Sequence, residues 1–197
     1  MFSMEMRKKI EKATVKLPET RGLGVIVPDG LILTAAHCVE LKKKNIIKIA
    51  LGDTLLMSVD CCGQQIKAEV YAIEPVADIA VLGMPYNYKL SQDYEKIINM
   101  IEPVKLKTDE IELGKEYPAM VFTHKGEWLQ GKVEKGNDNV PQILLEGAEI
   151  EQGTSGGPVI DQEGTLLGVV SNGDMKSFQI AYPLNALPVW VLKRIAE

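Results

Sequence analysis

Short apolar runs separated by turn residues recur along this chain from about residue 15 onward. In the first half, the runs are Gly24–Val27, Leu31–Leu33, Ile46–Leu51, Ile66–Ile73 and Ile79–Leu82. In the second half, they are Tyr117–Phe122, Glu127–Val133, Gln142–Glu146, Val159–Ile160, Thr165–Val170 and Phe178–Tyr182. Many short strands with turn signals between them are typical of an all-β sandwich or barrel.

Three segments break this strand pattern with helical spacing. Residues 3–14 are rich in helix formers, apolar residues recur every three or four positions between Pro85 and Pro103, and Leu184–Ala196 predicts a closing helix that Pro188 delays. The break at 85–103 divides the strands into two sets of similar number. We therefore expect one all-β domain over 1–197, made of two six-stranded antiparallel barrels with short N- and C-terminal helices. Its parts are barrel one at about 15–84, a linker at 85–103, barrel two at about 104–183 and the C-terminal helix at about 184–197.

The composition of the chain restricts the kinds of binding partner and the cellular compartment that we expect. The chain has 197 residues, 46% of them hydrophobic, and a net charge of −5 with scattered Lys and Arg, so it can build a core but carries no nucleic-acid footprint. No apolar stretch reaches membrane-spanning length, and the amino terminus lacks a leader-like apolar run. We expect a cytoplasmic protein that binds neither nucleic acid nor membranes.

The cysteine count is odd, and two cysteines are adjacent. Cys38, Cys61 and Cys62 do not form the evenly spaced framework of a secreted disulfide protein. We expect free thiols, although a single disulfide to Cys38 stays open. Vicinal cysteines and two separate histidines do not give tetrahedral ligand spacing, so neither a metal nor another cofactor is expected.

Three candidate catalytic groups lie in distinctive contexts. His37 occurs in Thr34-Ala35-Ala36-His37-Cys38, Asp78 begins the apolar run 78–82, and Ser155 lies in the glycine-dense segment 153–158. A serine hydroxyl needs an imidazole to take its proton and a carboxylate to orient that imidazole. Glycines around Ser155 allow backbone N–H groups to point at a substrate oxygen, as in an oxyanion hole.

Each candidate also has a plain structural interpretation. A single histidine can be a buried, hydrogen-bonded core residue, and a single aspartate can form an ion pair or cap a turn. A glycine-rich turn can bind phosphate, but here no Gly-Lys-Ser/Thr follows and the next segment is strand-like. His124 lacks any such context and is expected at the surface.

Taken in the order His, Asp, Ser, these segments resemble the trypsin-like serine peptidases of the chymotrypsin fold. In detail they resemble the bacterial Deg/HtrA type, over roughly residues 15–190. The segments that carry the likeness are Gly22–Val27 before Asp29–Thr34, then Asp78–Leu82, then Ser155–Asp161.

The resemblance implies the following roles. His37 is general base and then acid, Asp78 orients it, Ser155 is the nucleophile, and the N–H groups of Gly153 and Ser155 hold the oxyanion. The strand containing Ser171, Asn172 and Gly173 would pair with the substrate backbone. For the specificity pocket, two arrangements stay open. If Glu149 faces inward, it favours lysine or arginine before the scissile bond. If Glu149 faces solvent, Gln179 shortens the pocket, and small or medium side chains are preferred.

Departures from the family pattern bear on activation. Secreted trypsins place an aspartate before the serine, where it pairs with a new amino terminus after cleavage, but here that position is Thr154 and no Ile-Val-Gly-Gly start exists. Control would come from loop ordering, an activating partner or a homo-oligomer. Cys38 matches a half-cystine of the animal enzymes, yet no cysteine stands near Gly22. Within these 197 residues we expect no PDZ domain of the kind that the Deg/HtrA proteins carry.

The function expected from these observations is that of a serine endopeptidase, which hydrolyses protein or peptide substrates through an acyl-enzyme. The alternative is a catalytically idle or partner-activated module of the same fold that binds peptides or acts as an effector.

Overall fold

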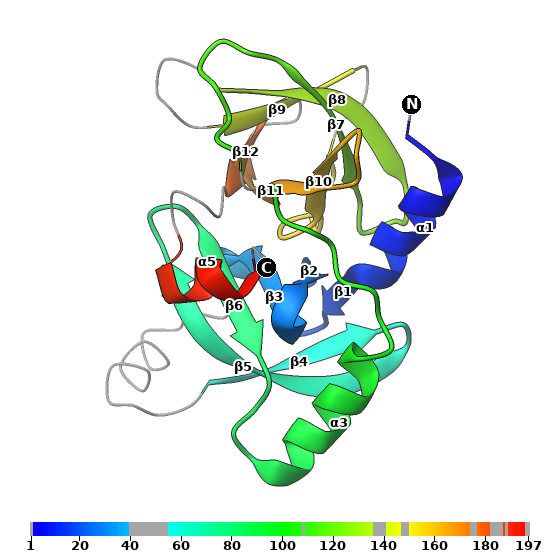
Figure 1. Cartoon of the computed structure of the whole chain (residues 1–197), viewed down its shortest axis with the longest axis vertical. Coiled ribbons are helices and arrows are strands. Elements are labelled where there is room, and N and C mark those ends of the chain that lie inside the picture. Colours follow the sequence, from blue (N-terminus) through cyan, green and yellow to red (C-terminus); the bar gives the residue numbers. More distant parts are fainter. Residues whose placement is uncertain are drawn as a thin grey trace.

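The computed structural model describes residues 2–39, 55–107, 109–135, 141–146, 150–173, 177–181, 187 and 189–195. These residues form two closed antiparallel barrels, one above the other in Figure 1, with strand orders β1-β2-β3-β6-β5-β4 and β10-β11-β12-β9-β8-β7. The strands of barrel one are β1 (Thr14–Leu17), β2 (Gly22–Val27), β3 (Leu31–Ala35), β4 (Leu56–Cys61), β5 (Gln64–Glu74) and β6 (Ile79–Gly83). Those of barrel two are β7 (Tyr117–Phe122), β8 (Trp128–Lys135), β9 (Pro141–Leu145), β10 (Pro158–Asp161), β11 (Leu166–Gly173) and β12 (Ser177–Ala181). The expected pair of six-stranded barrels is confirmed.

In barrel one, the strands nearest barrel two are apolar on both faces. All six residues of β2 and all five of β3 are buried, so neither strand shows the polar alternation of a half-exposed sheet. β3 pairs with β6 in a register that sets Ala35 opposite Ile79. This pairing brings the ends of the two strands that carry His37 and Asp78 to one place.

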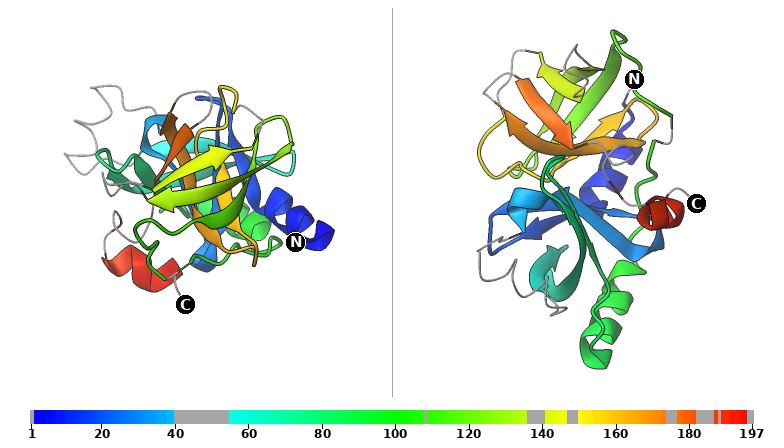
Figure 2. Two further views of the ribbon diagram at one scale, coloured as in Figure 1. Left: turned by 90° about the horizontal axis from the view of Figure 1, so that it is seen from above. Right: turned by 90° about the vertical axis from the view of Figure 1, so that its left-hand side faces the viewer.

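Barrel two closes around its own apolar cluster, which includes Val121, Ile143, Val159 and Val170. β10 pairs with both β7 and β11, with Val159 opposite Val121 and Gly168. The right-hand view of Figure 2 shows the two barrels stacked along the long axis of the molecule.

The helices lie outside the barrels. α1 (Met4–Ala13) is capped by Ser3, buries Ile10 and Ala13, and reaches barrel two where Glu11 accepts a 2.8 Å hydrogen bond from Trp128 Nε1. α3 (Tyr88–Ile98) covers the far end of barrel one, and α5 (Val189–Ile195) begins directly after Pro188. In the part of the chain described, no helix is long and apolar enough to cross a membrane.

Neither β1 nor β4 has a counterpart among the expected strands. β1 has only four residues and alternates between buried and exposed positions. The residues of β4 also alternate, and Ser58 and Asp60 occupy outward positions, so no continuous apolar run marks this strand. It ends at Cys61 before a turn in which Cys62 and Gly63 have positive φ angles. The expected run Ile46–Leu51 lies outside the described residues.

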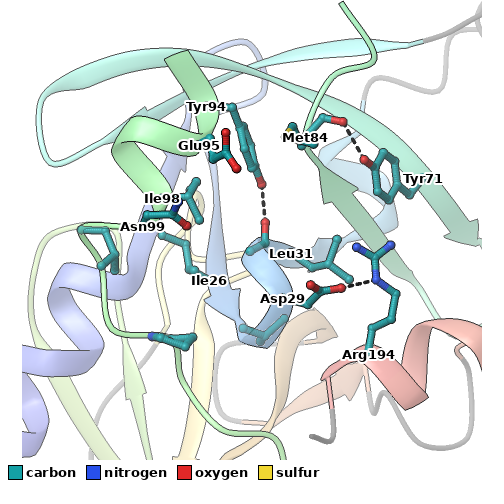
Figure 3. Close-up of a pocket in the computed structure, with 14 residues that line it drawn as sticks. Ile26, Asp29, Leu31, Tyr71, Met84, Tyr94, Glu95, Ile98, Asn99 and Arg194 are labelled. Carbon is teal, nitrogen blue, oxygen red and sulfur yellow. Dashed lines mark hydrogen bonds and ion pairs between the residues drawn. The ribbon is translucent and has the colours of Figure 1, made fainter. Parts of the chain in front are cut away.

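A cavity of about 490 Å³ lies on the outer side of barrel one, between α3, the turn Pro28–Gly30 and α5 (Figure 3). Several of its polar side chains are paired within the protein. Tyr94 donates to the carbonyl oxygen of Gly30 at 2.7 Å, and Arg194 pairs with Asp29. None of the three predicted catalytic residues lines this cavity.

Candidate active site

His37 is held just beyond the end of β3. The chain leaves the strand at Ala35 and makes one 3₁₀ turn over Ala36–Cys38, closed by the Val39 N–H on the Ala36 carbonyl at 3.0 Å. Both alanines are buried, whereas the His37 side chain is 45% exposed. The small residues therefore anchor the turn in barrel one and leave the imidazole at the surface.

Asp78 binds this turn with three of its oxygen atoms. Its carbonyl accepts the Ala36 N–H at 3.0 Å, Oδ1 accepts the His37 backbone N–H at 2.9 Å, and Oδ2 lies 2.8 Å from His37 Nδ1. The φ of Asp78 is +52°, a left-handed conformation that aspartate tolerates better than most side chains. This backbone conformation lets the residue before β6 turn its carboxylate toward the imidazole.

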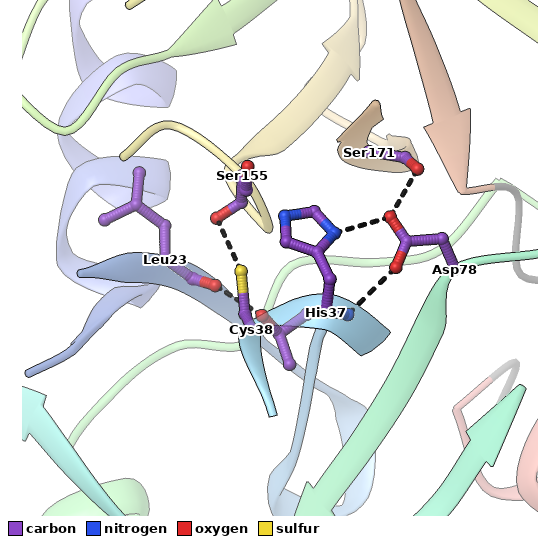
Figure 4. Close-up of polar contacts among 7 residues, drawn as sticks. Leu23, His37, Cys38, Asp78, Ser155 and Ser171 are labelled. Atoms are coloured by element: carbon purple, nitrogen blue, oxygen red, sulfur yellow. Dashed lines mark hydrogen bonds and ion pairs between the residues drawn. The ribbon is translucent and has the colours of Figure 1, made fainter. Parts of the chain in front are cut away.

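Barrel two also contacts this carboxylate. Ser171 in β11 is buried and donates its hydroxyl to Asp78 Oδ2 at 2.5 Å (Figure 4). Burial by itself would raise the pKa of Asp78, but the hydrogen bonds from His37 and Ser171 outweigh it and hold the pKa below 3.8. Asp78 is therefore ionised near neutral pH.

The same pairing acts on the imidazole. The hydrogen bond to Asp78, with a smaller contribution from Cys38, raises the pKa of His37 above its ordinary value of 6.5 against the effect of partial burial. Because Nδ1 faces the ionised carboxylate, it carries the hydrogen, and Nε2 is left to exchange a proton with another group.

Ser155 lies in a turn that packs against barrel one. Its carbonyl accepts the Leu23 N–H at 2.8 Å and the Cys38 thiol at 3.5 Å. Gly156 has φ +79°, and a Cβ there would lie 2.0 Å from the Leu23 carbonyl oxygen and 2.4 Å from Thr34 Oγ1. Only glycine fits this contact, which fixes Ser155 beside His37.

The imidazole lies between Asp78 and Ser155 (Figure 4). Its Nδ1 edge faces the carboxylate and its opposite edge is turned toward the serine. Among the described residues, no hydrogen bond joins Ser155 Oγ to His37, so the pair is aligned without being bonded in this state. Catalytic hydrogen bonds often tighten only when substrate binds.

The backbone N–H groups of this turn differ in whether the protein scaffold binds them. The N–H groups of Gly156 and Gly157 bond the carbonyls of Val170 and Thr154, at 2.7 and 2.8 Å. No backbone carbonyl in the described segments accepts the N–H of Gly153 or Ser155. These two donors are the pair expected to form the oxyanion hole.

The predicted substrate-binding residues are placed less completely. Gln179 is exposed in β12, opposite Gln142 of β9, and Gly173 ends β11 opposite Phe178, with Asn172 between it and Ser171. Glu149 lies outside the described residues. Ser171 has a contact that sequence reasoning missed, since its hydroxyl donates a hydrogen bond to Asp78.

His124 is more than the surface residue the sequence suggested. It is partly buried in the turn between β7 and β8, and its Nδ1 lies 3.3 Å from Thr154 Oγ1. No motif surrounds it in the sequence, so only the fold shows that it touches the turn containing Ser155.

The three cysteines are free thiols: Cys38 and Cys61 are buried and Cys62 is exposed. Burial raises the pKa of Cys61 to about 12, which keeps it protonated. Across the described residues, no group of three or more His, Cys, Asp or Glu side chains is arranged to hold a metal ion.

Comparison with known proteins is consistent with this geometry. Residues 22–169 match the profile of the trypsin-like peptidase domain. The serine protease Rv3671c of Mycobacterium tuberculosis is 26% identical over 175 residues, covering 84% of this chain and 39% of that protein. The mitochondrial serine protease HTRA2 of Bos taurus is 28% identical over 177 residues, covering 87% and 36% respectively.

Solved structures share the fold. The active form of the Rv3671c protease superposes with a TM-score of 0.62 at 19% identity, covering 96% of this chain and 83% of that one. A human astrovirus serine protease superposes with a TM-score of 0.57 at 17% identity, covering 90% and 94%. The chain spans less than two fifths of the length of the curated relatives it matches. With the profile match extending through most of both barrels, the chain belongs to the trypsin-like serine peptidase family and is similar within it to the Deg/HtrA type.

Proposed function

We propose that this protein is a serine endopeptidase in which His37, Asp78 and Ser155 form the catalytic triad. The observation that carries the proposal is the fixed Asp78–His37 pair, at 2.8 Å, with Ser155 on the opposite side of the imidazole. A merely structural histidine would not need a carboxylate that binds both its ring and its backbone.

In the first half of the reaction, Ser155 Oγ attacks the carbonyl carbon of the scissile peptide bond, and His37 Nε2 takes the hydroxyl proton. The negative oxygen of the tetrahedral intermediate accepts hydrogen bonds from Gly153 and Ser155 N–H. Asp78 stabilises the imidazolium without taking its proton. The intermediate collapses as His37 protonates the leaving amine, which leaves an acyl group on Ser155.

In the second half, His37 takes a proton from water as the water oxygen attacks the acyl carbon. The second intermediate expels Ser155, which recovers its proton from His37, and the carboxylic acid product leaves. Every proton removed by His37 is returned, so the reaction consumes one water and needs no cofactor.

The substrate class we propose is protein or peptide. β11 presents backbone at Ser171–Gly173 beside the nucleophile, where an extended substrate could add as a further strand. If Glu149 faces solvent, Gln179 shortens the specificity pocket and small or medium side chains are preferred before the scissile bond; if Glu149 faces inward, lysine or arginine is preferred. A peptide-library profile would distinguish the two. The unpaired thiols support action in a reducing compartment such as the cytoplasm.

Covalent labelling tests the proposal directly. A fluorophosphonate probe should label the wild-type chain at Ser155, and Ser155→Ala should abolish both labelling and peptide hydrolysis. Ser91→Ala, on α3 and away from the triad, should behave as wild type. Retention of labelling in Ser155→Ala would contradict the proposal. Absent labelling with unchanged peptide binding in Ser155→Ala would favour a binding module instead.

A further inference from the structure

The two ends of the Gly153–Gly157 turn are held by different parts of the protein. Its C-terminal end is fixed by backbone hydrogen bonds from Gly156 to Val170 and from Leu23 to Ser155. Nearer its N-terminal end, the Thr154 carbonyl accepts the Gly157 N–H at 2.8 Å within the turn. Among the described residues, the backbone hydrogen bond that ties this end to a residue outside the turn runs from the Thr154 N–H to the Glu151 carbonyl at 3.4 Å. At that length the hydrogen bond is weak, so side-chain contacts contribute to fixing the orientation of Gly153.

Thr154 provides such a contact. It is fully buried, and a buried hydroxyl without a partner is costly. Its Oγ1 lies 3.3 Å from His124 Nδ1, which is the hydrogen-bond partner that the described residues offer it. The side chain therefore ties the turn to the β7–β8 connection rather than to its own backbone.

His124 also packs on Gly153. A Cβ placed on Gly153 would lie 3.3 Å from His124 Cγ and 3.2 Å from the carbonyl oxygen of Arg21. The ring and this carbonyl thus lie on the side of Gly153 where a side chain would project, and the φ of Gly153 is +95°. The imidazole therefore borders the turn at the residue whose N–H is expected to bind the oxyanion.

The connection that carries His124 is itself rigid. The Thr123 N–H donates a hydrogen bond to the Glu127 carbonyl at 2.9 Å, and the Gly126 N–H donates one to the Thr123 carbonyl at 3.0 Å. Lys125 also pairs with Glu151 at 2.5 Å, but the two side chains are 49% and 57% exposed. An ion pair that exposed contributes little, so His124 is the contact that matters.

We propose that His124 is a positioning residue for the oxyanion hole, acting through the Nδ1–Thr154 hydrogen bond and through its ring on Gly153. The inference rests on the proposed function of the Gly153 and Ser155 N–H groups. Secreted trypsins have an aspartate at the position of Thr154, and this aspartate pairs with a new amino terminus. In this protein, His124 of barrel two binds Thr154 instead, so the contact needs no cleaved amino terminus.

The test compares His124→Ala, His124→Asn and His124→Gln. Asparagine places a hydrogen-bonding atom near the position of Nδ1, whereas glutamine places it near Nε2. We expect His124→Ala and His124→Gln to lower kcat and the rate of fluorophosphonate labelling by about 10- to 100-fold, approaching the loss of one oxyanion donor, with KM within about threefold. His124→Asn should recover most of the rate. Lys125→Ala, on the same turn, serves as the matched control and should stay within a few-fold of wild type.

Thr154→Val and Thr154→Ser test the same hydrogen bond from its other side, in case a substitution of His124 simply misfolds. Valine keeps the shape and removes the hydroxyl, so it should lower kcat as His124→Ala does, while serine should not. In the double variant His124→Ala/Thr154→Val the two losses should not multiply, since both remove the same bond. Equal kcat in wild type, His124→Ala and Thr154→Val, with labelling intact, would overturn the inference.

Amide hydrogen exchange at Gly153 and Ser155 separates this inference from the proposed function. If the wild-type chain neither labels nor hydrolyses peptides, the peptidase proposal fails. Faster exchange at Gly153 in His124→Ala than in His124→Asn would still show that His124 holds the turn. Unchanged exchange in both would refute that positioning role independently of activity.

Discussion

Gly22 lies so close to Cys38 that a side chain added at residue 22 would contact the Cys38 thiol. A Cβ there would lie 2.5 Å from Cys38 Sγ and 3.0 Å from Cys38 Cβ. Bonded cysteines have Cβ atoms about 3.8 Å apart, so a Gly22→Cys variant needs only a small outward shift of β2 to form a disulfide. We expect this variant to oxidise with Cys38 and to be more stable than wild type.

The magnitude follows from loop closure and strain. The loop from residue 22 to residue 38 contains 17 residues, for which closing a disulfide removes about 3 kcal/mol of unfolded-state entropy. Moving β2 against its fully buried neighbours offsets part of this. The net gain in unfolding free energy should be about 1–2 kcal/mol, which raises Tm by about 2–8 °C in a protein of this size.

Thermal unfolding with and without dithiothreitol measures the effect, and thiol titration counts the remaining free cysteines. Gly22→Ala is the matched control, because it adds the Cβ without the bond and should lower the unfolding free energy by about 1–3 kcal/mol. If Gly22→Cys keeps three reactive thiols plus the new one under oxidising conditions, or if its Tm does not depend on reductant, the placement of Gly22 against Cys38 is wrong.

Further predictions concern the triad and the core. The hydrogen bond to Asp78 raises the pKa of His37, and a general base must be neutral, so kcat/KM should rise with pH through a midpoint above 6.5. Asp78→Asn should lower that midpoint. A pH profile of peptide hydrolysis that is flat from pH 5 to 9 would contradict this prediction. Ser171→Ala removes a charge-assisted bond from Asp78, so it should raise the pKa of that carboxyl and lower kcat/KM about 10-fold, which steady-state kinetics would show. Tyr94→Phe removes the buried bond to Gly30 and should lower the unfolding free energy by about 1–2 kcal/mol with kcat unchanged, as urea denaturation combined with an activity assay would test.

The strands that are apolar on both faces were the easiest to predict from the sequence. β2, β3 and β6 appear as continuous apolar runs because each is buried throughout. β4 escaped prediction because every second residue faces outward, and its polar members break the run. The division into two barrels followed from the helical interval now occupied by α3.

For the site, local motifs predicted the residues of the proposed triad, but they could not show contacts between segments far apart in the sequence. The segment around Ser155 is recognisable because Gly156 leaves no room for a side chain. The bonds of Ser171 to Asp78 and of His124 to Thr154 join residues 93 and 30 positions apart with no motif to mark them. Such contacts arise from how the barrels close, which a one-dimensional pattern does not contain.

The division of the proposed triad between the barrels has a consequence for synthesis of the chain. The proposed base and acid, His37 and Asp78, emerge from the ribosome with the first half, and Ser155 arrives with the second. Neither half can cut peptides by itself, because a nucleophile without its base is inert. The growing polypeptide is therefore safe from its own activity until translation has passed the serine and both halves have docked.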